Sequence, residues 1–212
     1  MPNLPISQLP VANPLTGPEL FAIVQNGVTK QTTLTSIIYA QGNTYGLYSQ
    51  TSNSTIITNT TNETTLIGSG VGTLSVPANG FKVGDSFRAD FGGMLSSLNN
   101  ATLNIRVKTG AVSLSTSGIQ SLPSTSNDIW LLTLNFTIRA IGGPGVASIV
   151  TLGTFYDIKA SNNQQQGFSF NTVNNTTFDT TIPNTLDVTA QWGAASNSNS
   201  IYSDIFVLNK IY

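Results

Sequence analysis

The side chains best suited to acid–base chemistry in this 212-residue chain are nine carboxylates, because His and Cys are both absent. Without them the chain has no thiolate nucleophile, imidazole base, disulfide or zinc site of the usual kind. Glycoside hydrolysis needs two carboxylates flanking a sugar, and Asp179 and Asp187 flank one loop. Single Asp residues in β-rich chains usually serve turns and strand ends. We therefore expect no catalytic residue and no enzymatic activity, with a hydrolase as a minor alternative. The carboxylates are Glu19, Glu63, Asp85, Asp90, Asp128, Asp157, Asp179, Asp187 and Asp204.

Binding of metals or cofactors has no support in the residue pattern. No D-x-D-x-D-G run of a calcium loop occurs, so we predict no metal site and no cofactor. Phe168, Phe170 and Phe178 lie in a polar stretch and could stack on sugars, although a Phe is more often a core residue. Trp130 and Trp192 lie on periodic faces, and we assign both to the core.

Composition indicates an all-β protein. Charged residues make up 8% of the chain, against roughly 25% in an average globular domain, and Asn, Thr and Ser take their place. These residues are poor in helix interiors, whereas Thr is favourable in strands. The formal net charge is −1 without a basic run, so we expect no nucleic-acid partner. No signal-peptide pattern or apolar run of about 20 residues occurs, so we expect no membrane association and synthesis in a cytoplasm.

Short strand signals follow one another from Glu63 onward. The clearest are residues 101–108 and 129–141, in which apolar and polar side chains alternate strictly. Further strands are expected at 64–68, 73–76, 86–98, 111–117, 146–158, 185–192 and 199–211, with Gly92 and Gly93 forming a bulge. Residues 159–184 read as a long polar loop. About eight main antiparallel strands without a helix predict two packed sheets with Greek-key connections, a jelly-roll sandwich.

The last predicted strand, 199–211, is apolar on both faces. Ile201, Ile205 and Val207 share one face in strict alternation, and Tyr202, Phe206 and Leu208 share the other. A sandwich strand needs only one apolar face, so we expect a homotrimer with Tyr202, Phe206, Leu208 and Tyr212 at the interface. The alternative is a monomer in which Phe168 and Phe170 fold over the second face.

The first 45 residues have a different organisation. Asn26-Gly27 between two strand-like runs is a strong signal for a hairpin with a type I′ turn, since both central residues then need positive φ. Residues 15–18 read as a turn, and residues 36–41 as a short helix. Four Pro residues in 1–14 indicate an extended arm, or else a disordered tail. This segment is too small for a core of its own. We therefore expect an attachment segment at 1–45, a linker at 46–63 and the jelly roll at 64–212.

The stretch ISQLPVANPLTGPELFAIVQNGVTKQTTLTSI resembles the N-terminal segment of many tailed-phage virion proteins. In these, LPxxxxLTGxEL is followed by IVQNGVT, and the segment is thought to attach a fibre, spike or decoration module to the particle. The resemblance implies that the chain contacts other virion proteins through this segment. The alternative is an ordinary hairpin at the edge of a larger sheet. The attachment residues would be Leu15, Thr16, Gly17, Glu19, Leu20, Ile23, Val24, Asn26, Gly27 and Val28.

A second resemblance covers about 150 residues. The stretches GDSFRADFGGML and LNIRVKTG, with DTTIPNTLDVTAQWGAASNSNSI, are similar to C-terminal modules of phage structural proteins and, in strand order, to trimeric jelly rolls of the tumour-necrosis-factor type. Together the resemblances imply a non-enzymatic virion protein, made in the host cytoplasm and displayed as a head fibre or capsid decoration. The alternative is a tail-fibre protein that binds a glycan or protein of the host surface.

Overall fold

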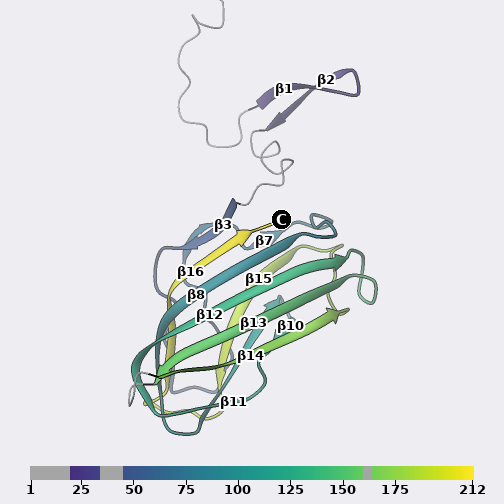
Figure 1. Cartoon of the computed structure of the whole chain (residues 1–212). Coiled ribbons are helices and arrows are strands. Elements are labelled where there is room, and N and C mark those ends of the chain that lie inside the picture. The colour runs from purple at the N-terminus through teal and green to yellow at the C-terminus, as the bar shows by residue number, and fades with distance from the viewer. Residues whose placement is uncertain (1–19, 34–44, 160–163) are drawn as a thin grey trace, which may run out of the picture. The chain divides into compact units, whose positions relative to one another are not determined.

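The computed structural model describes residues 20–33, 45–159 and 164–212 (Figure 1). The chain divides into two units, Met1–Asn43 and Thr44–Tyr212. The arm, the turn at 15–18 and the short helix predicted at 36–41 lie outside the described residues. No helix in the described ranges has the length and hydropathy of a membrane span.

A two-stranded hairpin is the described part of the first unit. It consists of β1 (Leu20–Gln25) and β2 (Val28–Thr33), which pair antiparallel from Leu20 with Thr33 to Gln25 with Val28. Asn26 has φ of 53° and Gly27 has φ of 75°. Both central residues therefore adopt the left-handed region that a type I′ turn requires, and the predicted hairpin is confirmed.

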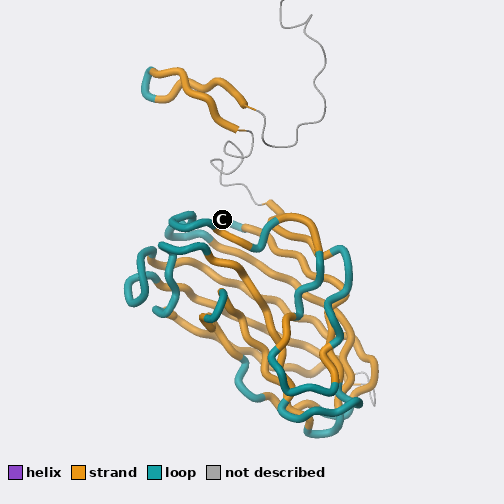
Figure 2. Tube along the Cα trace, turned by 180° about the vertical axis from the view of Figure 1, so that it is seen from behind, coloured by secondary structure: helices purple, strands orange, loops and turns teal. Residues whose placement is uncertain are grey.

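The second unit is a sandwich of two antiparallel sheets, which Figure 2 shows as two layers of strands. The larger sheet has the order β14-β13-β12-β8-β16-β3-β6, with β4 also paired to β16. Its strands are β3 (Tyr45–Gln50), β4 (Ile57–Thr58), β6 (Gly70–Gly72), β8 (Ser86–Ser97), β12 (Thr125–Ala140), β13 (Ser148–Lys159), β14 (Gln164–Asn175) and β16 (Ser200–Lys210).

The smaller sheet has the order β10-β9-β15-β5, with β11 paired to β9 and β7 paired to β15. Its strands are β5 (Thr64–Thr65), β7 (Ser75–Val76), β9 (Ala101–Thr109), β10 (Val112–Thr116), β11 (Gln120–Leu122) and β15 (Asn184–Trp192). The described residues are thus all-β, as predicted. They include several strands of only two or three residues besides the main ones.

The core lies between the two sheets and is built by strict alternation. On β12, Trp130, Leu132 and Leu134 point inward and are buried, while Leu131 and Thr133 between them point outward. Stacked rings continue this layer across the sheet, with Trp130 on Phe155 at 5.6 Å between centroids and Phe155 on Phe168 at 4.8 Å. Trp130 and Trp192 are both buried, so their assignment to the core is confirmed.

The loop predicted at 159–184 was wrong in part, because it contains β14. Phe168 and Phe170 alternate with small or polar residues and pack inward, which gives this edge strand its buried face. They lie at the opposite edge of the sheet from β3 and do not cover β16. The placement of Phe168 and Phe170 over β16, given as one way to cover a monomer, is therefore wrong.

The linker predicted at 46–63 is also different in the structure. β3 pairs with β16 inside the larger sheet, and β4 pairs with the start of β16. Tyr48 on β3 is buried with its ring 5.4 Å from that of Phe206. The high content of Gly, Ser, Thr and Asn concealed a strand that binds the sheet through backbone hydrogen bonds and two buried side chains, Tyr48 and Gln50.

A β-bulge lies in β16, where the register shifts between Ser203 and Ile205 and leaves Asp204 as the extra residue. Gly92 and Gly93 sit opposite this bulge in β8 and themselves pair regularly with β12, so the bulge predicted at this glycine pair was wrong. An extra residue moves every following side chain to the other face of the sheet. Ile201 and Ser203 therefore face the core before the bulge, and Phe206 and Leu208 face it afterwards.

Candidate functional site

The hairpin β1–β2 exposes apolar side chains on both of its faces. Leu20 is 63% and Val24 74% exposed on one face. Val28 is exposed on the other, where Phe21 and Ile23 are half-buried. An isolated two-stranded hairpin is at best marginally stable in water. Exposed apolar side chains on such a small sheet suit contact with another surface.

The attachment residues predicted from the sequence fall into two groups. Leu20, Ile23, Val24, Asn26, Gly27 and Val28 lie together in the hairpin and its turn, whereas Leu15, Thr16, Gly17 and Glu19 lie outside the described residues. The hairpin thus brings six of the ten residues into one small element.

The trimer-interface residues predicted on β16 do not share one face. Phe206 is fully buried and stacks on Phe91, with ring centroids 4.1 Å apart, and Leu208 is buried beside it in the core. These two assignments were wrong, because the bulge at Asp204 reverses the alternation on which they depended. Tyr202 is half-buried, and Tyr212 is exposed after the end of the strand.

The outer face of the larger sheet carries a different apolar surface, here named the large-face patch: Ile129, Leu131, Tyr156, Ile158 and Ile205. Leu131 pairs with Tyr156 on one side and with Gly92 on the other, and Gly92 pairs with Ile205. Gly92 has no side chain to separate its neighbours. A Cβ built on it would lie 3.1 Å from Ile205 Cγ2 and 3.2 Å from Leu131 Cδ2.

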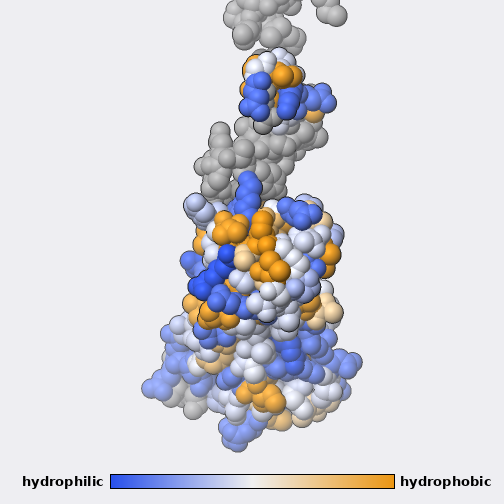
Figure 3. All heavy atoms as spheres, turned by 90° about the vertical axis from the view of Figure 1, so that its right-hand side faces the viewer, coloured by the Kyte–Doolittle hydropathy of each residue, from blue (hydrophilic) through white to orange (hydrophobic). Residues whose placement is uncertain are grey.

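The large-face patch spans four adjacent strands, β13, β12, β8 and β16. Ile205 is 54% and Leu131 51% exposed, and residues two apart on one strand lie on the same face. Contiguous exposed apolar surface of this kind marks interaction sites. The other exposed apolar side chains of the sandwich lie partly in loops, among them Ile141, Val146 and Ile182, and partly on strands, among them Leu152 on β13 and Val173 on β14. Figure 3, viewed from the side of the β12–β13 turn, shows hydrophobic atoms gathered in the upper half of the sandwich.

The outer face of the smaller sheet is polar and carries a cluster around Glu63. Its carboxylate accepts hydrogen bonds from Lys108 Nζ at 2.8 Å, Arg106 Nη1 at 3.2 Å and Thr189 Oγ1 at 2.7 Å. Burial by itself raises the pKa of Glu63, but the bonds from Lys108 and Thr189 and the two positive charges outweigh it and lower the pKa. Glu63 therefore remains ionised across the neutral range.

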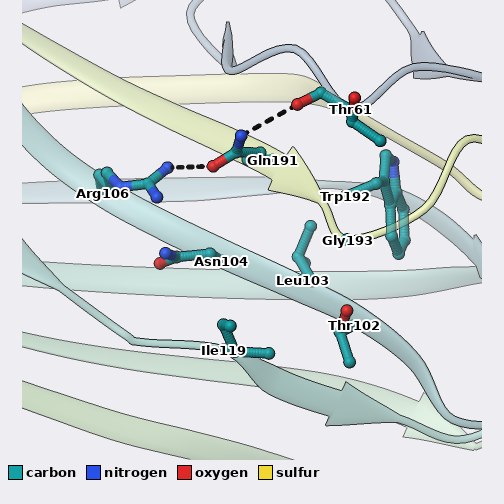
Figure 4. A pocket seen from close by; sticks show the side chains of 9 residues that line it. All are labelled: Thr61, Thr102, Leu103, Asn104, Arg106, Ile119, Gln191, Trp192 and Gly193. Atoms are coloured by element: carbon teal, nitrogen blue, oxygen red, sulfur yellow. Dashed lines mark hydrogen bonds between the residues drawn. The ribbon is translucent and has the colours of Figure 1, made fainter.

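A groove of about 300 Å³ adjoins this cluster near the start of β9 and the end of β15 (Figure 4). Gln191 joins two of its walls, because its Oε1 accepts from Arg106 Nη1 at 2.8 Å and its Nε2 donates to the Thr61 carbonyl at 2.9 Å. Gly193 closes one end, where its N–H donates to the Thr102 carbonyl at 2.9 Å. The lining residues are Thr61, Thr102, Leu103, Asn104, Arg106, Ile119, Gln191, Trp192 and Gly193.

The carboxylates considered for hydrolysis have separate partners. Asp179 Oδ1 accepts from the backbone N–H and hydroxyl of Thr181, and Asp187 Oδ1 accepts from Thr65 Oγ1. Asp157 is buried and accepts from Gln166 Nε2 at 2.8 Å. Burial raises the pKa of Asp157, and the negative charge of Asp128 adds to this. Within the described ranges, no group of three His, Cys, Asp or Glu side chains could hold a metal ion.

Sequence reasoning missed the groove and the large-face patch. The patch was recoverable in part, since Ile129 and Leu131 are apolar residues on the outward side of a strongly periodic strand. The groove had no such signal, because Thr61, Asn104, Ile119 and Gln191 are brought together only by the pairing of β9 with β15 and of β11 with β9. No protein-family model, no curated protein and no solved structure matches the chain.

Proposed function

We propose that the chain is a non-enzymatic structural protein of a tailed-phage virion, attached by its N-terminal segment and displaying the sandwich as a trimeric head fibre or capsid decoration. The single observation that carries this proposal is the hairpin β1–β2. Its type I′ turn lies at Asn26-Gly27, inside the stretch that resembles phage attachment segments, and both faces of the hairpin present exposed apolar side chains. The protein would be made in the host cytoplasm and carried on the particle.

The displayed domain is, in this proposal, a jelly roll with one added hairpin. In chain order the main strands lie in the large sheet (β3), small (β5), large (β8), small (β9, β10), large (β12), small (β15) and large (β16). The neighbours β3-β16-β8-β12 and β5-β15-β9-β10 then form two facing four-stranded sheets, the arrangement of a jelly roll. β13 and β14 extend the larger sheet beyond β12.

The assembly in this proposal is a homotrimer that buries the large-face patch. An axis lined by Leu131 and Ile205 would remove their exposed apolar surface from water, at about 25 cal/mol per Å² of apolar area. In a cyclic trimer, one surface of each copy contacts a second surface of the next copy. Three such contacts form a closed ring, so that no apolar contact surface remains exposed. Arg88 and Asp90, which pair at 2.9 Å on the same face, lie beside Val207 and could remain at the solvated rim.

Locating the protein on purified particles tests the proposed role. Antibody labelling and electron microscopy of particles should find it at fixed positions, and mass spectrometry should find it at a copy number divisible by three. Its absence from particles made in cells that express it would overturn the virion role.

A turn variant tests the attachment site on its own. Gly27→Val forces a β-branched residue into positive φ, at a cost on the order of 1–2 kcal/mol, and should reduce incorporation into particles. The matched control is Gly110→Val, because Gly110 also has positive φ with open space around it but lies in the β9–β10 turn of the sandwich. Equal incorporation of the two variants would contradict a role for the hairpin.

A further inference from the structure

We propose that the groove on the smaller sheet binds a neutral, hydroxyl-rich ligand, namely an uncharged sugar residue of a glycan. This inference goes beyond attachment and assembly, and does not depend on either. It concerns the surface between the end of β15, the start of β9 and the segment before β11 (Figure 4). Its volume of about 300 Å³ is at the lower end of ligand pockets, which span about 300–1,000 Å³.

The groove presents hydrogen-bonding groups that the protein itself leaves unused. Asn104 Oδ1 accepts from Thr116 Oγ1 at 2.8 Å, which orients the amide and leaves its Nδ2 donors without a partner among the described residues. Arg106 uses only Nη1 in the hydrogen bonds of that part of the chain. The hydroxyls of Thr61 and Thr102 likewise have no partner there. Amide, guanidinium and hydroxyl groups together can both donate to and accept from the hydroxyls of a sugar.

The charge around the groove is balanced, which disfavours an anionic ligand. Arg106 and Lys108 both pair with Glu63, and Asp187 lies opposite Lys108 on the neighbouring strand. Two positive and two negative groups therefore share this face. Phosphate and carboxylate sites instead concentrate unpaired positive charge. A ligand without formal charge can use the free donors and does not compete with Glu63 for the cations.

The rim of the groove adds one apolar contact. Ile119 is 77% exposed although it is a large apolar residue. A sugar ring presents C–H groups on its faces and hydroxyls at its edge, so it can cover Ile119 while its hydroxyls reach Asn104 and Arg106. Trp192 lies beneath the groove, buried and bonded through Nε1 to the Ile57 carbonyl at 3.0 Å. It supports the floor and leaves no aromatic face for stacking, so the affinity for one sugar residue should be low.

The groove lies at the end of the sandwich opposite the point where the chain enters it. Tyr45, the first residue of β3, pairs with Lys210 at the end of β16, whereas Trp192 and Ser200 mark the other end. Figure 1 shows β11, beside the groove, at the lower end of the sandwich and the C-terminus at its upper end. A ligand site at that end is open to glycans on an approaching surface, and repeated copies would raise the avidity.

A glycan array with the full-length protein, followed by calorimetric titration with the best-bound free trisaccharide, tests this proposal. The array should contain uncharged oligosaccharides and their sialylated or sulfated counterparts. We expect retention of uncharged glycans and at least a tenfold loss of affinity in Asn104→Leu, which keeps the side-chain size but removes the donors. Thr102→Val, a milder change, should lower the affinity severalfold.

The matched control is Asn135→Leu, because Asn135 is a half-buried Asn on the outer face of the larger sheet. Asn135→Leu should bind like the unchanged protein, and thermal unfolding should be alike for all three variants. Binding of sulfated or sialylated glycans alone, unchanged binding by both groove variants, or no retention of any uncharged glycan would overturn the proposal. None of these results bears on where the protein lies in a particle, so the two proposals fail independently.

Discussion

The outer faces of the two sheets differ sharply although both sheets share one core. The larger sheet places Leu131 and Ile205 side by side across Gly92, with no charge between them. The smaller sheet places Glu63 between Arg106 and Lys108, beside a groove lined by amides and hydroxyls. Stability of the single sandwich requires neither arrangement, since the core is filled from the inner faces. The two proposals above assign different surroundings to these faces, another protein surface for the larger sheet and a polar ligand for the smaller one.

The largest expected effect on stability comes from a substitution on the inner face of β16. Phe206→Asp should unfold the sandwich, because it removes a ring stacked on Phe91 and buries a carboxylate. Truncating a buried Phe alone costs about 3–5 kcal/mol, a large part of the roughly 5–15 kcal/mol that stabilise a domain. Circular dichroism during heating measures the melting temperature of the variant and of the unchanged protein. A melting temperature equal to that of the unchanged protein would show that Phe206 is not in the core.

The neighbouring variant tests assembly without unfolding. Ile205→Asp changes an exposed side chain, so the free energy of unfolding of the single chain should change by no more than about 0.5 kcal/mol. Light scattering at micromolar concentration should find a trimer for the unchanged protein and single chains for Ile205→Asp. Ile119→Asp, which alters an exposed Ile in the segment before β11, beside the smaller sheet, should leave the trimer intact. A single-chain mass for the unchanged protein would contradict the proposal that the large-face patch is buried in a trimer.

The buried carboxylate of Asp157, between the two sheets, should make the stability of the sandwich fall as the pH rises. The pKa of Asp157 is raised above 3.8 by burial, so its contribution to stability is full below pH 3.8 and is lost as the pH rises through the higher folded-state pKa. Asp157→Asn removes this loss and should raise the melting temperature at neutral pH relative to the unchanged protein. Scanning calorimetry at several pH values measures the difference, and an equal or lower melting temperature at neutral pH would contradict it.

The smallest expected effect concerns Glu63 on the outer face of the smaller sheet, whose contribution to stability depends on pH in the opposite direction from that of Asp157. The pKa of Glu63 is lowered below 4.5, so its contribution is present above pH 4.5 and is lost as the pH falls through the lower folded-state pKa. Glu63→Gln should lower the melting temperature slightly at neutral pH and leave it less sensitive to acid. Asp90→Asn on the other sheet is the control, since Asp90 and Arg88 form an exposed pair that water screens. Equal acid sensitivity of Glu63→Gln and the unchanged protein would contradict the assignment.

The sequence was sufficient for those elements that local rules determine. The alternation in β12 and the Asn26-Gly27 turn follow from side-chain period and from backbone φ alone. The face of β16 could not be predicted in the same way, because a bulge is set by tertiary contacts. Ser203 is held by hydrogen bonds with the backbone and side chain of Ser54 and with the side-chain amide of Gln50, both more than a hundred residues earlier.

The groove and β3 illustrate a second reason for the misses. Asn104 and Gln191 are ordinary strand residues until β9 and β15 pair, and no spacing within either strand indicates that they meet. Tyr48 lies in a stretch of Gly, Ser, Thr and Asn that is typical of linkers. Its role depends on Phe206, which lies at the other end of the domain sequence.

The pairing of Tyr45 with Lys210 has a consequence for how such a domain can be recombined. The chain enters β3 and leaves β16, its last strand, at neighbouring points at one end of the sandwich, so the two connections to a host protein would lie close together. Domains with adjacent ends tolerate insertion and circular permutation well. Residues 44–212 could therefore be transplanted as a cassette into an exposed loop of an unrelated scaffold, with both connections at one end and the opposite end left for display.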